Sequence, residues 1–325
     1  MVIPKSHTGQ LKLLLYLAGL APSSHNTQPW NFSVDKHSIS VWADLSRRLA
    51  VGDPQDRELY TSIGAAIQNI LSSAQALGIK TSYTLFPLPQ SPDLVARIDL
   101  VFGHGSITAK GSAILSAIET RRTNRTPYDP NKLLPLKVTK QITSLASHLG
   151  GKLVLVTKRE TIKRLAKMVE QGMLKFLSNP TFREELSGWI RHDWSKKGDG
   201  LPGYSIGMPG IVSIIAPILI KSPGPIKEVA ASERKVVESC STLGVITIPA
   251  DNKNWWVKTG MIFESLALTL ETQGIATAIL TSIVESQAER QKLKTIVKGT
   301  PGLFFRVGYS TGPGVSVPRR THVTH

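Results

Sequence analysis

The sequence predicts an α+β protein built from two related halves, with mixed sheets flanked by helices. Three observations predict it. Helical patterns outnumber strands and do not alternate strictly with them, as they would in a doubly wound parallel sheet. An apolar stretch bounded by glycines, 64–78, is echoed at 260–274. Each copy is followed, after a gap, by a short apolar strand, at 94–102 and 302–308.

The individual elements follow from the spacing of apolar residues. Steps of three and four residues predict helices at about 9–20, 56–77, 109–122, 136–148, 158–177, 227–241, 253–273 and 286–297. Short apolar or alternating runs predict strands near 39–43, 81–86, 95–102, 152–157, 243–248 and 303–309. Each repeated helix follows an Asp-led polar segment and ends in Gly-Ile, where a left-handed cap suits Gly78 and Gly274.

We expect the first half to cover 1–108 and the second 109–325. Between about 159 and 241 the second half contains material that the first lacks. The centre of this insertion, 196–210, is rich in Gly and Pro and is predicted to be irregular. Long ordered loops of this kind are often lids, but a plain surface insertion is equally compatible with the composition.

Charge is the unusual global property, since 39 basic and 23 acidic residues give a formal net charge of +16. Such an excess favours anionic partners: phosphates, nucleic acid or membrane surfaces. A basic surface without such a partner is an equal alternative, because Lys and Arg are spread along the whole chain. No recognition-helix, zinc-finger or aromatic RNA-binding signature appears, so no specific nucleic-acid binding is expected.

Membrane and metal classes find little support in the sequence. The longest apolar run, 211–220, is about half of the ~20 residues that a membrane span needs. The N-terminal stretch superficially resembles a signal peptide, but Lys12 inside it favours an amphipathic helix. We therefore expect a cytoplasmic protein without a membrane partner. Cys240 is alone and the eight histidines lack ligand spacing, so no metal site is expected.

Two polar clusters are candidates for ligand binding. The first is APSSHNTQPW at 21–30, between a predicted helix and a strand. Asn26 and Gln28 offer both donors and acceptors, as the polar edge of a flavin ring requires, and Pro22, Ser23 and Ser24 would bring backbone N–H groups near such a ring. An ordinary capped turn, in which His25 packs, is the alternative reading.

The second cluster is RRTNR at 121–125, at the end of a predicted helix. Arginine forks match the geometry of a phosphate, and a threonine hydroxyl can add a further hydrogen bond. A solvated charged face is the alternative for an isolated run of this kind. Arg319 and Arg320 form a weaker basic pair near the C-terminus.

Four motifs together resemble the nitroreductase-like FMN-binding flavoproteins, and specifically their fused, double-length (Acg-type) subgroup. The motifs are PSSHNTQPW at 22–30, RRLAVGDPQDREL at 47–59 with the GAAIQN helix, RRTNR at 121–125, and the less distinctive RVGYS…RR at 306–320. The resemblance covers roughly 10–125 and 240–320. It implies the nitroreductase fold, with the two halves forming a pseudo-dimer inside one chain, which we expect to be a monomer.

In ordinary members of that family, two identical subunits form the flavin site across their interface. One subunit contributes an Arg-Arg-Ser-x-Arg motif and a C-terminal basic pair, and the other a Pro-Ser-x-x-Asn segment. Here the first half has the Pro-Ser segment and the second has RRTNR and the terminal arginines. The resemblance therefore implies one complete FMN site per chain and the loss of a second.

The resemblance also assigns site residues by position. It places one group at the phosphate and the polar edge of the ring: Arg121, Arg122, Thr123, Arg125, Arg319 and Arg320. It places a second group along the ribityl chain and ring: Pro22, Ser23, Ser24, Asn26 and Gln28. Thr281 and Ser282 fall near the reactive edge of the flavin. No side chain is expected to act as the catalytic group, because the flavin carries the chemistry.

The expected function is that of an FMN-dependent oxidoreductase, passing electrons from NAD(P)H through FMN to a nitroaromatic, quinone or similar small-molecule acceptor. A non-catalytic protein that sequesters FMN, its flavin covered by the 196–210 segment, is the alternative. A basic nucleic-acid binder is a third class, which predicts salt-sensitive retention on DNA or RNA.

Overall fold

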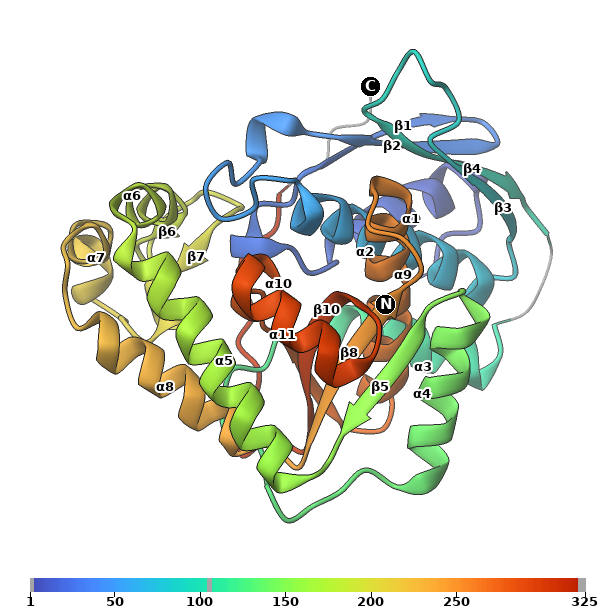
Figure 1. Ribbon diagram of the computed structural model, residues 1–325. Helices are drawn as coiled ribbons and strands as arrows, with labels where there is room; N and C mark the ends of the chain where they lie inside the picture. Colours follow the sequence, from blue (N-terminus) through green and yellow to red (C-terminus); the bar gives the residue numbers. More distant parts are fainter. Residues whose placement is uncertain (1–2, 104–106, 321–325) are drawn as a thin grey trace.

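The computed structural model describes residues 3–103 and 107–320, and its centre consists of two four-stranded sheets (Figure 1). The first sheet contains, from edge to edge, β1 (Trp30–Asp35), β2 (Ser38–Ala43), β4 (Leu94–Val101) and β3 (Lys80–Leu85). The second contains β5 (Lys152–Val156), β8 (Thr242–Ile248), β10 (Thr300–Gly308) and β9 (Ala276–Ile279). Each sheet is thus drawn from one part of the chain.

Neighbouring strands in both sheets run antiparallel. The sequence predicts mixed sheets, and parallel pairing occurs at two places among the described residues. One is a parallel bridge between Thr123 and Thr277 at the second sheet. The other is a separate parallel pair of short strands, β6 (Ile190–Arg191) and β7 (Leu201–Pro202). Every residue of β8 is buried, which agrees with its continuous apolar sequence and its position between two other strands.

The helices surround and separate the sheets. Those outside the insertion are α1 (His7–Gly19), α2 (Arg57–Ala76), α3 (Ala109–Thr120), α4 (Leu136–His148), α9 (Lys253–Glu271), α10 (Ser282–Glu285) and α11 (Gln287–Val297). Those inside it are α5 (Arg159–Ser178), α6 (Pro180–Gly188), α7 (Val212–Lys221) and α8 (Ile226–Glu238). Three short 3₁₀ turns are η1 (Ser24–Asn26), η2 (Leu45–Arg47) and η3 (Gly203–Ile206). The 196–210 segment therefore contains a short strand and a turn rather than irregular chain alone.

Helices α2 and α9 cross between the two sheets and pack on each other closely (Figure 1). A Cβ atom on Gly64 would lie 1.9 Å from the carbonyl oxygen of Val257, and one on Gly260 would lie 1.8 Å from that of Thr61. Each glycine is 196 positions from its counterpart, as Thr61 is from Val257. The contact is therefore reciprocal, as in an isologous interface between two copies of one surface.

Aromatic and basic side chains repeat the same relation. The Arg57 guanidinium lies 5.5 Å from the centre of the Trp256 ring, and the Lys253 ammonium lies 5.0 Å from that of Tyr60. The same interval of 196 positions relates Arg57 to Lys253 and Tyr60 to Trp256. The two related halves that the sequence predicts thus pack around a pseudo-twofold axis between α2 and α9.

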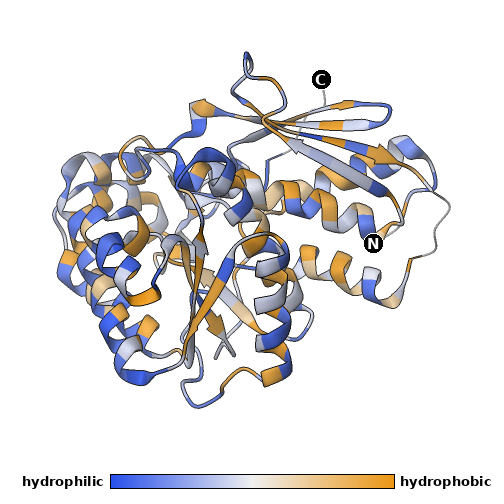
Figure 2. Ribbon diagram, turned by 45° about the vertical axis from the view of Figure 1, so that its right-hand side comes forward, coloured by the Kyte–Doolittle hydropathy of each residue, from blue (hydrophilic) through white to orange (hydrophobic). Residues whose placement is uncertain are grey.

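One large apolar core includes residues of α1, α2, α9 and both sheets, and apolar stretches colour the strands and the helices between them in Figure 2. A second cluster lies between α5, α8 and the outer face of the second sheet. A small third cluster supports β6, β7 and α7. Within the described residues, no helix has the length and apolar character needed to cross a membrane.

The connection between helix and strand differs strongly in length between the halves. Residues 20–29 join α1 to β1, whereas only residues 149–151 join α4 to β5. The longer connection contains the PSSHN motif, and the shorter one contains Gly150, against which the Trp255 ring packs. The loop that carries the Pro-Ser motif therefore has no counterpart of similar size in the second half.

Candidate functional site

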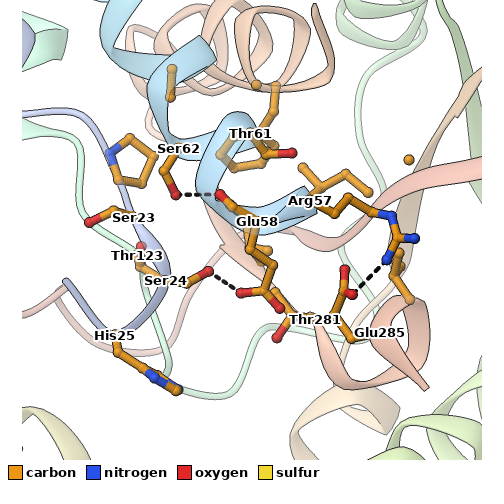
Figure 3. Close-up of a pocket in the computed structure, with 18 of the residues that line it drawn as sticks. Ser23, Ser24, His25, Arg57, Glu58, Thr61, Ser62, Thr123, Thr281 and Glu285 are labelled. Carbon is orange, nitrogen blue, oxygen red and sulfur yellow. Dashed lines mark hydrogen bonds and ion pairs between the residues drawn. The ribbon is translucent and has the colours of Figure 1, made fainter. Parts of the chain in front are cut away.

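A cavity of about 140 Å³ lies where the two halves meet (Figure 3). Its walls come from the loop after α1, the first turns of α2, the middle of α9, and the segment from β9 to α10. Six residues expected at the site line it: Pro22, Ser23, Ser24, Thr123, Arg125 and Thr281. The structure therefore brings together residues from both expected half-sites.

The loop that carries the Pro-Ser motif has an unusual backbone. His25, Asn26 and Gln28 have φ angles of 48°, 53° and 51°, a left-handed conformation that side chains with a Cβ rarely adopt. The Ser23 hydroxyl accepts a hydrogen bond of 2.9 Å from the Gln28 backbone N–H and so helps to hold the turn. Such clustered strain persists only where surrounding contacts enforce it, and it is typical of functional loops.

Those surrounding contacts involve Asn26 and Gln28, which do not line the cavity. The Asn26 amide donates to the carbonyl oxygens of Gly200 at 3.0 Å and Pro318 at 2.9 Å. The Gln28 amide donates to the Gly198 carbonyl at 2.7 Å. Both side chains thus tie the loop to the insertion and to the C-terminal segment, rather than facing a ring as the resemblance implies.

Carboxyl groups dominate one side of the cavity. The Glu58 carboxylate accepts a short hydrogen bond from the Ser24 hydroxyl, and Figure 3 shows it directed into the space between Ser24 and Thr281. Glu285 lies beside it, with its carboxylate 2.6 Å from Arg57 Nη1. Burial, followed by the charges of Glu285 and Asp53, raises the pKa of Glu58 well above its ordinary value.

The pKa values of the neighbouring carboxyls change in the same direction. Burial, then Glu285, raises the pKa of Asp53 from 3.8 to about 7. Burial also raises the pKa of Glu285, although Arg57 opposes the shift. Because like charges at close range disfavour ionisation, the protonated forms of these carboxyls are favoured relative to free carboxyls.

His25 lies on the wall between this cavity and a second one of about 120 Å³. Burial, followed by the charge of Arg125, lowers the pKa of His25 from 6.5 to about 4, so its ring is neutral at pH 7. Its Nδ1 atom is buried and has no hydrogen-bond partner among the described residues. The ring therefore offers an unused polar atom next to both cavities.

The second cavity is mainly apolar. Phe176 and Phe182, from α5 and α6, form its far wall. Four residues belong to both cavities: His25, Glu58, Thr281 and Glu285. Ser282 lines the second cavity alone, and its hydroxyl donates a hydrogen bond of 3.3 Å to the Val169 carbonyl.

Arg57 and Arg125 line the first cavity, whereas Arg121, Arg122 and Arg319 gather beside it. The Arg319 guanidinium donates to the carbonyl oxygen of Ala21 at 2.9 Å, and Arg121 donates to that of Leu20 at 3.2 Å. Burial, then repulsion from Arg121 and Arg122, lowers the pKa of Arg319 to about 9. Glu264 opposes this repulsion, and its carboxylate lies 3.0 Å from Arg121 Nε. Arg121 and Arg319 thus lie near one buried carboxylate, with Arg122 close enough to both to repel them.

Arg320 serves mainly to fix the loop. Its backbone N–H donates to the Gln28 side-chain oxygen at 2.9 Å, and its Nη1 atom donates to the Gln28 carbonyl at 2.8 Å. A second tie holds the insertion in place, since Asp199 forms ion pairs with both Arg47 and Arg191. The loop is therefore bonded to two segments that also lie against each other, residues 198–200 and 318–320.

The sequence reasoning did not single out the carboxyls Asp53, Glu58 and Glu285, nor Arg57. The first two, with Arg57, lie in the DPQDREL stretch that contributed to the resemblance, so the signal was present but was assigned no chemistry. Glu285 follows the expected Thr281 by one helical turn. Its approach to Glu58 is a long-range contact that no local pattern reveals.

The residues present fit FMN in their chemistry. The buried arginine cluster has excess positive charge beside backbone and hydroxyl donors, as a phosphate requires. The space is less generous, because ligand pockets usually measure ~300–1,000 Å³, against about 140 and 120 Å³ for the two cavities. Entry of the ring therefore requires the shared side chains, chiefly those of Glu58 and His25, to move and join the cavities.

Comparisons with known proteins extend over nearly the whole chain. No family model matches it. It is 24% identical over 322 residues, 96% of this chain and 94% of the relative, to the Mycobacterium tuberculosis protein named "Putative NAD(P)H nitroreductase acg". A second protein of that organism, also named "Putative NAD(P)H nitroreductase", is 25% identical over 322 residues, 95% of this chain and 89% of its own length.

Among solved structures, similarity extends to the FMN-dependent nitroreductase NfnB from Mycobacterium smegmatis in complex with NADPH. It is 13% identical, covers 65% of this chain and 96% of that chain, and has a TM-score of 0.43. Over nearly its whole length, the chain is thus similar to two relatives that are named putative NAD(P)H nitroreductases.

Proposed function

We propose that this protein is an FMN-dependent oxidoreductase of nitroreductase type, which passes electrons from NAD(P)H to a nitroaromatic, quinone or similar small acceptor. The observation that carries the proposal is the cluster of Arg121, which is buried, with the half-buried Arg122 and Arg319, beside a cavity built by both halves. The names of the relatives, which specify NAD(P)H and nitroreduction, support the same activity.

The arginine cluster would hold the phosphate of FMN. Each guanidinium presents several donors in a plane, and the charge of Glu264 compensates only part of their total. Asn26, Gln28 and Arg320 would then act indirectly, by keeping the strained loop against the ligand. Thr123, Arg125 and Thr281 line the cavity and are placed to contact the ligand directly.

The bound flavin would supply hydride transfer between the nicotinamide and the acceptor. The chain supplies a proton store beside it. Burial, followed by the charges of Glu285 and Asp53, raises the pKa of Glu58 and so favours its protonated form, and the hydroxyl of Ser24 fixes its carboxyl group. A reduced quinone or nitro group must gain protons as well as electrons, and Glu58 and Glu285 are acids that line the cavity.

Sequestration of FMN is the second candidate function, and one observation favours it. Residues 198–200 and 318–320 are bonded over the Pro-Ser loop, and the cavities beneath are small. A flavin held under such a cover would be shielded from acceptors. We rank this function second because the carboxyl cluster has an evident role in reduction and none in storage.

We further propose that the halves divide at about 1–108 and 109–325, that the chain acts as a monomer in the cytoplasm, and that it holds one flavin. The division into halves is supported because each four-stranded sheet is built from strands of one half alone. A single flavin is supported by the short 149–151 connection, which leaves the second half without a Pro-Ser loop.

An absorption spectrum of the purified protein, with identification of the released chromophore, tests the proposal. FMN that bleaches with NADPH under anaerobic conditions and recovers with a quinone would support the oxidoreductase. FMN that stays oxidised would favour sequestration, and a protein that cannot be loaded with flavin would overturn both. The variant R319Q should retain FMN at least about tenfold less tightly, whereas R97Q, at an exposed position on β4, should retain it normally.

A further inference from the structure

The outward face of α7 exposes an apolar surface that the proposed function does not use. It comprises Ile211, just before the helix, and five residues within it: Val212, Ile214, Ile215, Ile218 and Leu219. Ile211 and Ile218 are 79% and 69% exposed. Figure 1 shows α7 at the outer edge of the molecule, beyond α5 and far from the two sheets. This is the longest apolar run of the sequence, 211–220.

The spacing of these residues is that of a face normally buried in a core. Positions 211, 214, 215 and 218 repeat at three- and four-residue steps, as in a helix that packs on a sheet. Yet the side of α7 that faces the protein presents the small residues Ser213 and Ala216, both fully buried. Single exposed apolar residues need no explanation, whereas a contiguous group of this size marks an interaction surface.

An aromatic side chain extends this surface. Trp194 is 61% exposed, and the neighbouring Asp193 is fixed to the start of α7. The Asp193 carboxylate accepts a hydrogen bond of 2.6 Å from Gly210 N–H, and its own N–H donates to the Ser213 hydroxyl at 3.0 Å. Trp194 thus directly follows a residue that is bonded to the start of α7, and tryptophan is typical of the boundary between water and lipid.

The charges around α7 leave a positive excess. The nearby acids are largely engaged inside the protein, since Asp193 caps backbone N–H groups, Asp199 pairs with two arginines and Glu184 pairs with Lys221. In the described part of the chain, three exposed lysines near α7 form no ion pair: Lys196, Lys197 and Lys227. The neighbouring Glu228 is also exposed and forms no ion pair there. The molecule as a whole has a formal charge of +16.

This combination distinguishes between possible occupants. A second copy of the chain would bring together two surfaces with unpaired lysines, on two molecules that each carry +16, and like charges oppose such contact. An anionic lipid surface offers apolar chains to the isoleucines and negative headgroups to the lysines. The expectation of no membrane partner rested on the absence of a spanning segment, which a surface contact does not need.

We propose that α7, with Ile211 and Trp194, is a docking surface for anionic membranes, on which the helix lies parallel to the lipid surface. Its ten residues are too few to cross the bilayer but suffice to insert one face at the headgroup boundary. The surrounding lysines contact anionic headgroups. The contact is reversible, because neither the apolar face nor the lysines alone anchor a protein stably.

Sedimentation with vesicles tests this docking surface in the full-length protein. We expect binding to vesicles of phosphatidylcholine with roughly 30% phosphatidylglycerol, little binding to pure phosphatidylcholine, and release at about 0.5 M salt. The double variant I214Q/I218Q should bind anionic vesicles about tenfold more weakly. The variant K196Q/K197Q should lose most of the dependence on phosphatidylglycerol.

The matched control is L133Q/L136Q, which alters two leucines that are 60% and 70% exposed elsewhere on the molecule. It should bind as the unchanged protein does, and circular dichroism melting should show that all variants fold. Absence of binding to either vesicle, or equal loss in the control, would overturn the proposal. So would a dimer, measured by analytical ultracentrifugation, that I214Q/I218Q converts to a monomer, because α7 would then be covered by a second copy.

Discussion

Asp53, Glu58 and Glu285 place three carboxyl groups in one corner of the candidate site, with Arg57 bonded to Glu285. Natural proteins seldom bury so many like charges without a function, because each unpaired buried charge lowers stability by about 3–5 kcal/mol. Retention of protons lowers this cost. The same retention gives the site an acid that a simple flavin-binding cavity would lack.

Replacement of Glu58 by Gln tests the role of this acid. The variant keeps the size of the side chain and an acceptor for the Ser24 hydroxyl but has no carboxylic proton. We expect flavin reduction by NADPH to be unchanged and reoxidation by a quinone to slow by about 10²-fold, as followed by anaerobic stopped-flow absorbance. The variant E184Q, at an exposed site on α6, serves as the control. Equal reoxidation rates in the two variants would remove Glu58 from the mechanism.

The raised pKa of Asp53 predicts a dependence of stability on pH. The folded protein keeps the Asp53 proton up to a pKa of about 7, whereas the unfolded chain loses it near 3.8. The folded state therefore binds more protons between these values, and the free energy of unfolding falls as pH rises from about 4 to about 7, then levels off.

The substitution Asp53→Asn should flatten this slope, because the amide does not titrate and its oxygen can still accept the bond of 2.9 Å from Leu59 N–H. Urea unfolding midpoints over that pH range provide the measurement. An unchanged slope in the variant would show that other groups set the dependence.

At the scale of whole elements, the crossing of α2 and α9 depends on two glycines. A Cβ atom on either would meet a backbone carbonyl at less than 2 Å, and neither backbone can withdraw without separating the helices. The crossing also sets the site, because Arg57, Glu58 and Thr61 come from α2 while Gly260 and Phe263 come from α9.

The substitution Gly64→Ala should therefore lower the free energy of unfolding by about 3 kcal/mol or more, measured by urea denaturation. Gly188, the last residue of α6, has open space where a Cβ would lie. Gly188→Ala should leave stability unchanged or raise it by up to ~1 kcal/mol. A tolerated Gly64→Ala would mean that the helices cross less closely than described.

Elements with a clear apolar period could be predicted from the sequence, and others could not. Helices such as α2, α5 and α9 begin and end within two residues of their predicted limits. α7 was not predicted because its sequence is apolar on every side and contains Pro217. β9 has four residues and α10 a single turn, so neither is long enough to show a period.

The same division holds for the site. Local motifs located the Pro-Ser loop and the RRTNR segment, because each is continuous in sequence. They could not show that Asn26 reaches Gly200 and Pro318, since those contacts join positions 174 and 292 residues apart. Nor could they show that Glu58 and Glu285 meet, because ion clusters depend on how the two halves pack.

At the scale of the molecule, the two halves are related in their packing but differ in their connections. The pseudo-twofold packing of α2 and α9 relates the halves, yet ten residues join α1 to β1 and three join α4 to β5. The proposed flavin site uses the longer loop, so the position related by the pseudo-twofold axis lacks the corresponding wall. Duplication thus allowed one half to keep the loop and the other to keep the basic motif.

This asymmetry predicts a stoichiometry of one FMN per chain. Flavin released by acid from the saturated protein, measured by absorbance against protein determined by amino-acid analysis, should give a ratio close to one. A ratio close to two would require a second site that functions without a Pro-Ser loop, and would contradict the argument from the short connection.

The bonds from Pro318, Arg319 and Arg320 to the Pro-Ser loop also order events during synthesis. The ribosome makes these residues 292 positions after the loop residues that they contact. At ~5–20 residues per second, the strained loop waits some tens of seconds for its partners. The first sheet can form in that interval, but the left-handed residues of the loop still lack their bonds to residues 318–320. Maturation of the site is thus deferred until translation has passed residue 320, and an abandoned nascent chain emerges without a competent site.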